Sequence, residues 1–239
     1  MKKGLRQRPG RGGSGRAWAV LAVMGACAAM APEARAQVWV ERVRTFAVGE
    51  TLGDLEDPPR VFAGTVSGTG IVSLTEVKVG LRLVGAPEGF ASEMVVMLTK
   101  DLQRTSVLLN QVGVGVGSGL GAVVGYGYNG WNVTFADGAA AGDVHVLDGG
   151  SGVLTGEVAP DGRVLPTDTV RPGMLSVMNG LPGDGVWHLS VADVGVGGTM
   201  RLESWSVTLT GVVPEPGASA VAMGMGLVAF AGWLRWRRR

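Results

Sequence analysis

Short runs of alternating apolar and polar residues, separated by glycine, proline and aspartate, fill the middle of this chain and constrain its fold more than any other feature. In "GIVSLTEVKVGLRLVG", every second residue from Val77 to Leu83 is apolar, and the intervening residues are mostly charged. This alternation puts the apolar side chains on one face of a strand. It predicts a half-buried antiparallel strand with a bend or bulge near Gly80.

Runs of the same kind recur along the chain, and helix signals are scarce. Trp187 and Trp205 each begin a run with apolar residues on one face, which predicts a hairpin-like pair of strands around an aromatic core. Many strands without intervening helices favour an all-β sandwich or barrel. The further predicted strands are Glu93–Thr99, Thr105–Leu109, Trp131–Phe135, Val144–Leu147, Val186–Ala192 and Met200–Thr210.

The first 36 residues read as a secretory signal peptide. A basic segment precedes the apolar run Ala17–Ala31, and "ARA" follows directly before Gln37. Small residues at these positions suit signal peptidase, so cleavage is expected between Ala36 and Gln37. The apolar run is shorter than the roughly 20 residues of a membrane-spanning helix. The mature chain would then lack cysteine, because Cys27 lies within the removed segment.

Charge is distributed unevenly along the chain. Residues 37–211 carry ten Lys or Arg and eighteen Asp or Glu, whereas both flanking segments are basic. Nucleic-acid binding needs a clustered basic surface, which an acidic, glycine-rich domain does not offer. The sequence therefore predicts no nucleic-acid partner.

The segment 213–239 begins with "VPEP", continues with an uncharged apolar run at 218–234, and closes with an arginine cluster. As a helix the apolar run would measure about 25 Å, slightly less than the hydrocarbon core of a bilayer. The alternatives for such a tail are a permanent membrane anchor and a core helix with a basic end. The residues that define its motif are Pro214, Glu215, Pro216, Arg237, Arg238 and Arg239.

This three-part pattern resembles the PEP-CTERM sorting signal. The resemblance implies transient insertion of residues 218–234 in the inner membrane, recognition by an exosortase, removal of the tail, and delivery to the cell surface or extracellular matrix. Proline at positions 214 and 216 would also keep the motif extended and unpaired.

The segment from Met94 to Thr210 resembles the P domain, also called the P/Homo B domain, of subtilisin-like proprotein convertases. The resemblance rests on "LSVMNG", "GDGVWHLSVAD", "VGVGGTM" and "LESWSVTL", in that order. It implies a jelly-roll-like antiparallel β-sandwich over residues 37–212. The family's usual Ser-Pro-Asp-Gly turn is replaced here at residues 100–104, and Gly197 stands where aspartate is common.

No cofactor is predicted, and calcium is the one ion that the acidic loops suggest, since it prefers oxygen ligands from turns. The candidate ligands are Asp137, Asp143, Asp184 and Asp193.

Catalytic signals are weak. The chain has two histidines, His145 and His188, and no Gly-x-Ser-x-Gly motif. His188, Ser190 and Asp193 could supply a triad by composition, but neighbours along one strand lack triad geometry. We therefore expect an exported, non-enzymatic β-sandwich that serves as a structural or binding component of the surface or matrix. Its partner would be a glycan such as exopolysaccharide, another surface protein or a second copy of itself. A secreted hydrolase or a protease-accessory domain is the alternative.

Overall fold

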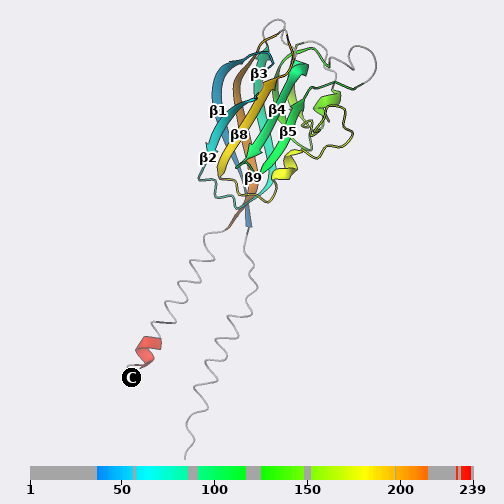
Figure 1. The fold of residues 1–239 in the computed structure, drawn as a ribbon. Coiled ribbons are helices and arrows are strands. Elements are labelled where there is room, and N and C mark those ends of the chain that lie inside the picture. The colour runs from blue at the N-terminus through cyan, green and yellow to red at the C-terminus, as the bar shows by residue number, and fades with distance from the viewer. Residues whose placement is uncertain are drawn as a thin grey trace, which may run out of the picture. The chain divides into compact units, whose positions relative to one another are not determined.

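The computed structural model describes residues 37–55, 58–85, 91–116, 125–147, 152–196, 198–214, 230 and 233–237. Within these residues the chain forms nine strands and three short 3₁₀ turns (Figure 1). The strands are β1 (Gln37–Leu52), β2 (Arg60–Val66), β3 (Ser73–Gly85), β4 (Met94–Lys100), β5 (Arg104–Asn110), β6 (Tyr128–Phe135), β7 (Gly152–Val158), β8 (Gly185–Asp193) and β9 (Met200–Pro214). The turns are η1 (Ala91–Glu93), η2 (Val144–Val146) and η3 (Leu175–Met178).

The strands form two sheets. The five-stranded sheet has the order β1-β9-β3-β6-β7, and the four-stranded sheet has the order β2-β8-β4-β5. Neighbouring strands are antiparallel except β6 and β7, which are parallel. The all-β sandwich expected from the sequence is therefore present, but the expectation of a purely antiparallel arrangement is wrong at one edge. The chain returns through η2 to the start of β6 before it forms β7.

The core lies between the sheets and is built from the alternating residues of both. Trp131, Trp187 and Trp205 are almost fully buried in it. The predicted hairpin of Trp187 and Trp205 does not form, because β8 lies in the four-stranded sheet and β9 in the five-stranded sheet. Each sheet supplies one of these indoles to the shared core. The alternation therefore predicted correctly that both indoles are buried, but the prediction that their strands pair with each other is wrong.

Local geometry agrees with one expectation and differs from another. The register of β3 against β9 shifts between Leu74 and Glu76 and again between Arg82 and Leu83, and the second irregularity lies near Gly80, as expected. The predicted strand Val144–Leu147 is instead the turn η2, because the Asp143 side chain accepts a hydrogen bond from the His145 backbone N–H at 3.0 Å. Such local capping by aspartate competes with strand pairing.

The two ends of the sandwich pair with each other. In the β1–β9 ladder Gln37 lies opposite Pro214, so β9 extends two residues beyond the expected boundary at 212. The expectation that Pro214 stays unpaired is wrong: proline lacks an N–H, but it can still occupy the last position of a strand. Strands β1, β2 and β7 are not among the predicted strands; each is an edge strand whose exposure weakens the alternation.

The predicted signal peptide at 1–36 lies outside the described residues, as does most of the tail at 215–239, including Glu215, Pro216, Arg238 and Arg239. Among the residues that are described, no helix is both long and apolar enough to cross a bilayer. The predicted spanning segment 218–234 falls largely in the part not described, and Arg237 belongs to a short helical stretch at 233–237.

Candidate binding groove

The outer face of the five-stranded sheet carries polar side chains at regular spacing. In β9, buried apolar residues alternate with outward-facing residues that are partly exposed. The outward-facing residues are Ser204, Ser206, Thr208 and Thr210. The register places Thr45 of β1, Ser206 of β9 and Gly80 of β3 side by side. Because opposed residues point to the same face, this row forms a continuous polar strip across the sheet.

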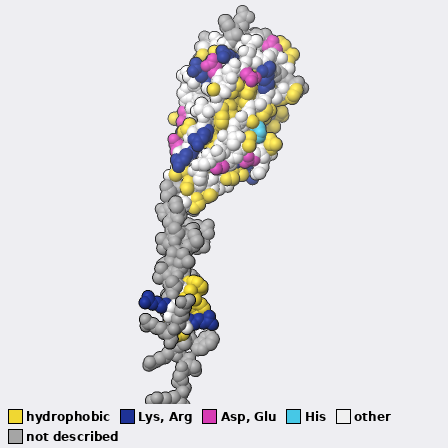
Figure 2. Space-filling model, turned by 90° about the vertical axis from the view of Figure 1, so that its left-hand side faces the viewer, with side chains coloured by type: hydrophobic (Ala, Val, Ile, Leu, Met, Phe, Trp, Pro, Cys, Tyr) yellow, Lys and Arg dark blue, Asp and Glu magenta, His cyan; other side chains and the backbone are white. Residues whose placement is uncertain are grey.

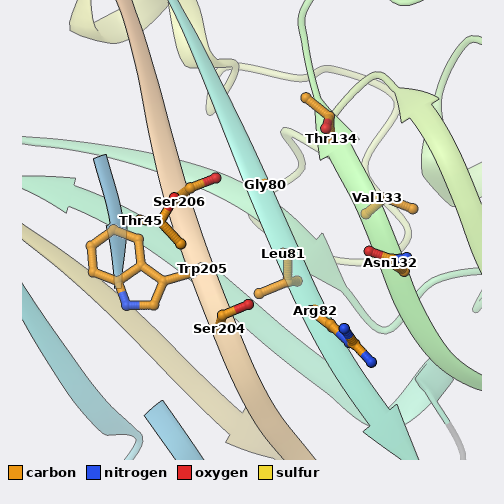
Figure 3. A pocket seen from close by; sticks show the side chains of 10 residues that line it. All are labelled: Thr45, Gly80, Leu81, Arg82, Asn132, Val133, Thr134, Ser204, Trp205 and Ser206. Atoms are coloured by element: carbon orange, nitrogen blue, oxygen red, sulfur yellow. The ribbon is translucent and has the colours of Figure 1, made fainter. Parts of the chain in front are cut away.

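A shallow groove with a volume of 310 Å³ runs over this strip. Figure 3 shows its side chains on neighbouring strands, with Gly80 between Ser206 and Thr134. The volume is at the lower end of the range for small-ligand sites. The groove is lined by Thr45, Gly80, Leu81, Arg82, Asn132, Val133, Thr134, Ser204, Trp205 and Ser206.

Gly80 keeps the groove open. A Cβ atom at this position would lie 2.5 Å from the Ser206 Oγ, closer than real Cβ contacts allow. The missing side chain therefore creates the depression and lets the Ser206 hydroxyl lie across the backbone of β3. The irregularity predicted near Gly80 lies between Arg82 and Leu83, and Gly80 itself makes the close approach to Ser206.

The groove is rich in neutral hydrogen-bonding groups. The serine and threonine hydroxyls and the Asn132 amide can donate to and accept from a ligand, and the Arg82 guanidinium can donate. The lining contains no carboxylate or imidazole. Arg82 also pairs with Glu203 at 3.3 Å. Such a surface can hold a polar ligand, but its own side chains supply no acid–base pair for hydrolysis.

Charges surround the groove on the same face. Lys78 Nζ lies 3.0 Å from a Glu157 oxygen and 3.9 Å from a Glu76 oxygen. The hydrogen bond to Glu157 is the main cause of a raised pKa for Lys78, and Glu76 and Glu41 add to it. These exposed pairs contribute little stability each.

The outer face of the four-stranded sheet is different. The register aligns Ala63 of β2, His188 of β8, Thr99 of β4 and Thr105 of β5, and a neighbouring row aligns Val61, Ser190, Met97 and Val107. Neither row contains Lys, Arg, Asp or Glu. This face is thus apolar or weakly polar, with His188 near its middle.

The trio of His188, Ser190 and Asp193 does not form a triad. His188 and Ser190 occupy alternate positions of β8, and Asp193 ends that strand and accepts a hydrogen bond from the Gly195 N–H at 3.2 Å. The His188 Nδ1 is buried and has no hydrogen-bond partner among the described residues. Triad chemistry needs the imidazole between nucleophile and carboxylate, and this strand does not provide that order.

His145 lies in a buried ionic cluster that the sequence did not reveal. Its Nδ1 is 2.6 Å from an Asp161 oxygen, and its Nε2 is 3.0 Å from the Val114 carbonyl oxygen. Asp161 is fully buried and His145 is 1% exposed. The imidazole–carboxylate pair has the orientation of half a triad, but a backbone carbonyl stands where a nucleophile would be needed.

Arg163 joins this cluster to Asp143. Its guanidinium lies 3.2 Å from Asp161 and 2.7 Å from Asp143, and Arg171 lies 3.5 Å from Asp143. Burial would lower the pKa of Arg163, but the hydrogen bonds to Asp143 and Asp161 raise it overall. The cluster holds together the segments around 143–146 and 161–171, and the latter leads to Gly173, which covers β5 by accepting the Val107 N–H at 2.8 Å.

The four predicted calcium ligands lie at separate places. Asp137 accepts the backbone N–H groups of Leu175 and Ser176 at the start of η3. Asp143 pairs with arginine, Asp184 binds the loop at Gly68 and Thr69, and Asp193 ends β8. No group of three or more His, Cys, Asp or Glu suited to a metal occurs among the residues described. The four carboxylates are thus not brought together.

Carboxylates do approach one another at the start of β4. Burial is the main cause of a raised pKa for Glu93, and the nearby charges of Asp193 and Asp54 raise it further. At the other end of this sheet, a hydrogen bond from the Thr69 hydroxyl is the main cause of a lowered pKa for Asp184. Sequence reasoning missed Glu93 and Asp161, because the contacts that define them join segments far apart in the chain.

Comparison with known proteins gives little further information. No protein-family model matches the chain, and no curated protein matches it. Among solved structures, the chain is similar to the crystal structure of the serine protease of Aeromonas sobria, with 15% sequence identity and a TM-score of 0.41. The similarity covers 78% of this chain and 29% of that protein. This chain therefore spans less than a third of that protein's length, and a likeness at this level carries no argument about activity.

Proposed function

We propose that this chain is an exported surface or extracellular-matrix protein whose jelly-roll-like, P/Homo B-like sandwich is a non-catalytic binding domain. Signal peptidase would remove residues 1–36, and residues 213–239 would act as a PEP-CTERM signal read by an exosortase. The surface polysaccharide of the producing cell is the proposed ligand of the polar groove.

The pairing of the two ends of the sandwich carries this proposal. Strand β1 begins at Gln37, directly after the expected signal-peptidase site, and lies opposite Pro214, the first residue of the Pro-Glu-Pro motif. The described β1–β9 ladder runs from Gln37 to Pro214, so removal of residues 1–36 and of the tail beyond Pro214 would leave all of its strand pairs in place. This supports a protein that is processed at both ends.

The groove supports a binding role over a catalytic one. Its lining offers hydroxyl, amide and guanidinium groups, which match the hydroxyl-rich surface of a glycan. A hydrolase based on either histidine would need a nucleophile at the imidazole. The Nε2 of His145, which is not the nitrogen that contacts Asp161, instead lies 3.0 Å from the Val114 carbonyl oxygen.

Mass spectrometry of both termini tests the proposal. We expect protein from the cell surface or medium to begin at Gln37 and to lack the arginine cluster. Surface protein that still contains Met1 and Arg239 would overturn the processing proposal. Incubation with the purified surface polysaccharide should give retention without fragmentation; release of shorter chains would instead support the hydrolase alternative.

A further inference from the structure

The first and last strands of the sandwich, β1 and β9, begin and end at the same pole (Figure 1). Gln37 lies opposite Pro214, and two residues further along Trp39 lies opposite Val212. The turns before β3 and between β4 and β5 are at the same end of the strands. We call residues 37–40, 67–72, 100–104 and 211–214 the terminal pole.

Hydrogen bonds hold the parts of the terminal pole together. The Asp184 carboxylate accepts the Gly68 N–H at 2.9 Å, and the Asp184 carbonyl oxygen accepts from Lys100 Nζ at 2.9 Å. The Val72 N–H donates to the Val212 carbonyl oxygen at 2.9 Å. The loops of both sheets are thus tied into one surface, so a partner would meet them together.

This surface exposes large apolar side chains. Trp39 is 62% exposed, Val72 53% and Leu102 80%. Leu102 sits at a turn with a φ of 57°, in the left-handed region where glycine or asparagine is usual. An exposed leucine in this backbone conformation adds nothing to packing within the sandwich. Figure 2 shows hydrophobic side chains gathered at the lower end of the domain.

The tether to the proposed membrane segment is short. Four peptide units separate Pro214 from Ala218, the first residue of the uncharged apolar run. Fully extended they span about 14 Å. The interfacial zone of one leaflet is roughly 7 Å deep, from the difference between the whole bilayer and its hydrocarbon core. If residues 218–234 cross the membrane, the terminal pole is therefore held at or just above the headgroups.

We propose that the terminal pole rests on the bilayer surface before the tail is removed, with Trp39 and Leu102 in the interfacial zone. The inference rests on the proposed membrane insertion of residues 218–234. Indole rings favour the interface, and exposed leucine gains by leaving water there. Arg104 is exposed at the start of β5, next to the turn that holds Leu102, and can contact anionic headgroups. The domain would thus present the sorting motif at a fixed height.

The opposite pole provides matched controls. Leu55 is 61% exposed with a φ of 53°, and Val196 is 66% exposed. Leu55 lies beyond the far end of β1, where its N–H bonds the Gly195 carbonyl oxygen at 3.2 Å. These side chains match Leu102 and Trp39 in exposure but lie away from the proposed membrane.

The test uses single cysteines in the full chain, because Cys27 is its only cysteine. In a Cys27→Ala background, Trp39→Cys, Leu102→Cys, Leu55→Cys, Val196→Cys and Leu227→Cys are labelled with an environment-sensitive fluorophore. Each protein is reconstituted in vesicles of phosphatidylethanolamine and phosphatidylglycerol that contain spin-labelled lipid. Quenching by headgroup-labelled and by chain-labelled lipid then reports depth.

We expect headgroup-labelled lipid to quench positions 39 and 102 at least twofold more than positions 55 and 196. Position 227 should be quenched most by deep chain labels. Deep quenching at 227 without quenching at 39 and 102 would overturn this inference and leave the proposed tail insertion intact. Loss of quenching at 227 would overturn both, and equal quenching at both poles would overturn the orientation.

Discussion

The two outer faces of the sandwich are built on the same alternation but present different chemistry. The outward positions of the five-stranded sheet carry Lys78, Arg82 and Glu157 around a polar groove. The aligned outward rows of the four-stranded sheet carry no Lys, Arg, Asp or Glu. This difference in charge is not needed for folding, since both sheets bury their inward side chains in the shared core. The open polar face is therefore the better candidate for ligand binding.

The two sheets also differ in what covers them. At the β5 edge of the four-stranded sheet, Val107 is buried because the segment at Gly173 pairs with it. That segment is held by the buried cluster of Asp161 and Arg163. Among the residues that the structure describes, no comparable segment covers the groove on the five-stranded sheet. The four-stranded sheet is thus covered at its β5 edge by a segment that the Asp161–Arg163 ion pair holds in place. The charged residues beside the groove, by contrast, are exposed on an uncovered face.

Removing the buried cation should have the largest effect. Arg163→Met leaves the buried carboxylate of Asp161 and the partly buried carboxylate of Asp143 with one cation fewer, which should lower the free energy of unfolding by about 3 to 5 kcal/mol. Urea unfolding measures this change. Hydrogen exchange at the Val107 amide should also quicken as its cover at Gly173 loosens. A loss below about 1 kcal/mol would mean that the cluster does not secure this edge.

Filling the groove should have the next largest effect, on binding. Gly80→Ala places a methyl group against the Ser206 hydroxyl, and we expect at least a tenfold loss of affinity for the surface polysaccharide, equivalent to about 1.4 kcal/mol. Gly138→Ala is the matched control, because no heavy atom lies within 4 Å of its Cβ position. Equal affinity of both variants in a titration would move the binding site away from the groove.

A smaller effect is expected at the end of the four-stranded sheet. The raised pKa of Glu93 means that the folded state holds this proton more tightly than the unfolded state, so ionisation at neutral pH disfavours folding. Glu93→Gln should therefore raise the melting temperature at pH 7, by about 1 to 3 °C. The gain should disappear as pH falls through the pKa of Glu93, where the wild-type carboxyl is itself protonated.

The same variant tests calcium. If calcium bound at Glu93, the substitution would remove a ligand and lower the melting temperature in the presence of the ion. Chelator would then lower the melting temperature of the wild type but not that of the variant. If the variant is stabilised and chelator does not change the melting temperature of the wild type, calcium does not bind at Glu93.

The smallest effect is expected on the exposed charges beside the groove. Lys78→Met removes the pairs with Glu157 and Glu76, which should change the free energy of unfolding by no more than about 1 kcal/mol. The raised pKa of Lys78 means that its contribution is present at neutral pH and is lost as pH rises through that pKa. It should also weaken with salt, unlike that of Arg163. Equal salt dependence in the two variants would erase the distinction between the faces.

Sequence reasoning recovered the local features and missed the long-range ones. Alternation found the buried faces of β3, β8 and β9, because a period of two follows directly from strand geometry. It placed Trp187 and Trp205 in one hairpin, because alternation carries no information on which strands pair. Edge strands such as β7 escaped because both of their faces are partly exposed.

The candidate site followed the same rule. Asp143 was noticed as an acidic loop residue, but its partner Arg163 is twenty residues away, and calcium was inferred in place of an ion pair. The groove side chains come from β1, β3, β6 and β9, and no local motif joins them. Gly80 was the single visible signal, since a glycine within a strand marks either a bulge or a close approach.

Hydrogen–deuterium exchange of the full-length protein, with and without the surface polysaccharide of the producing cells, tests the central claim most directly. The two faces fall in separate peptides, so one experiment compares them. We predict slower exchange in residues 78–84, 130–134 and 203–208, which form the groove, and unchanged exchange in residues 95–99 and 186–191 of the four-stranded sheet. Slower exchange confined to the four-stranded sheet, or no change on either face, would contradict the account.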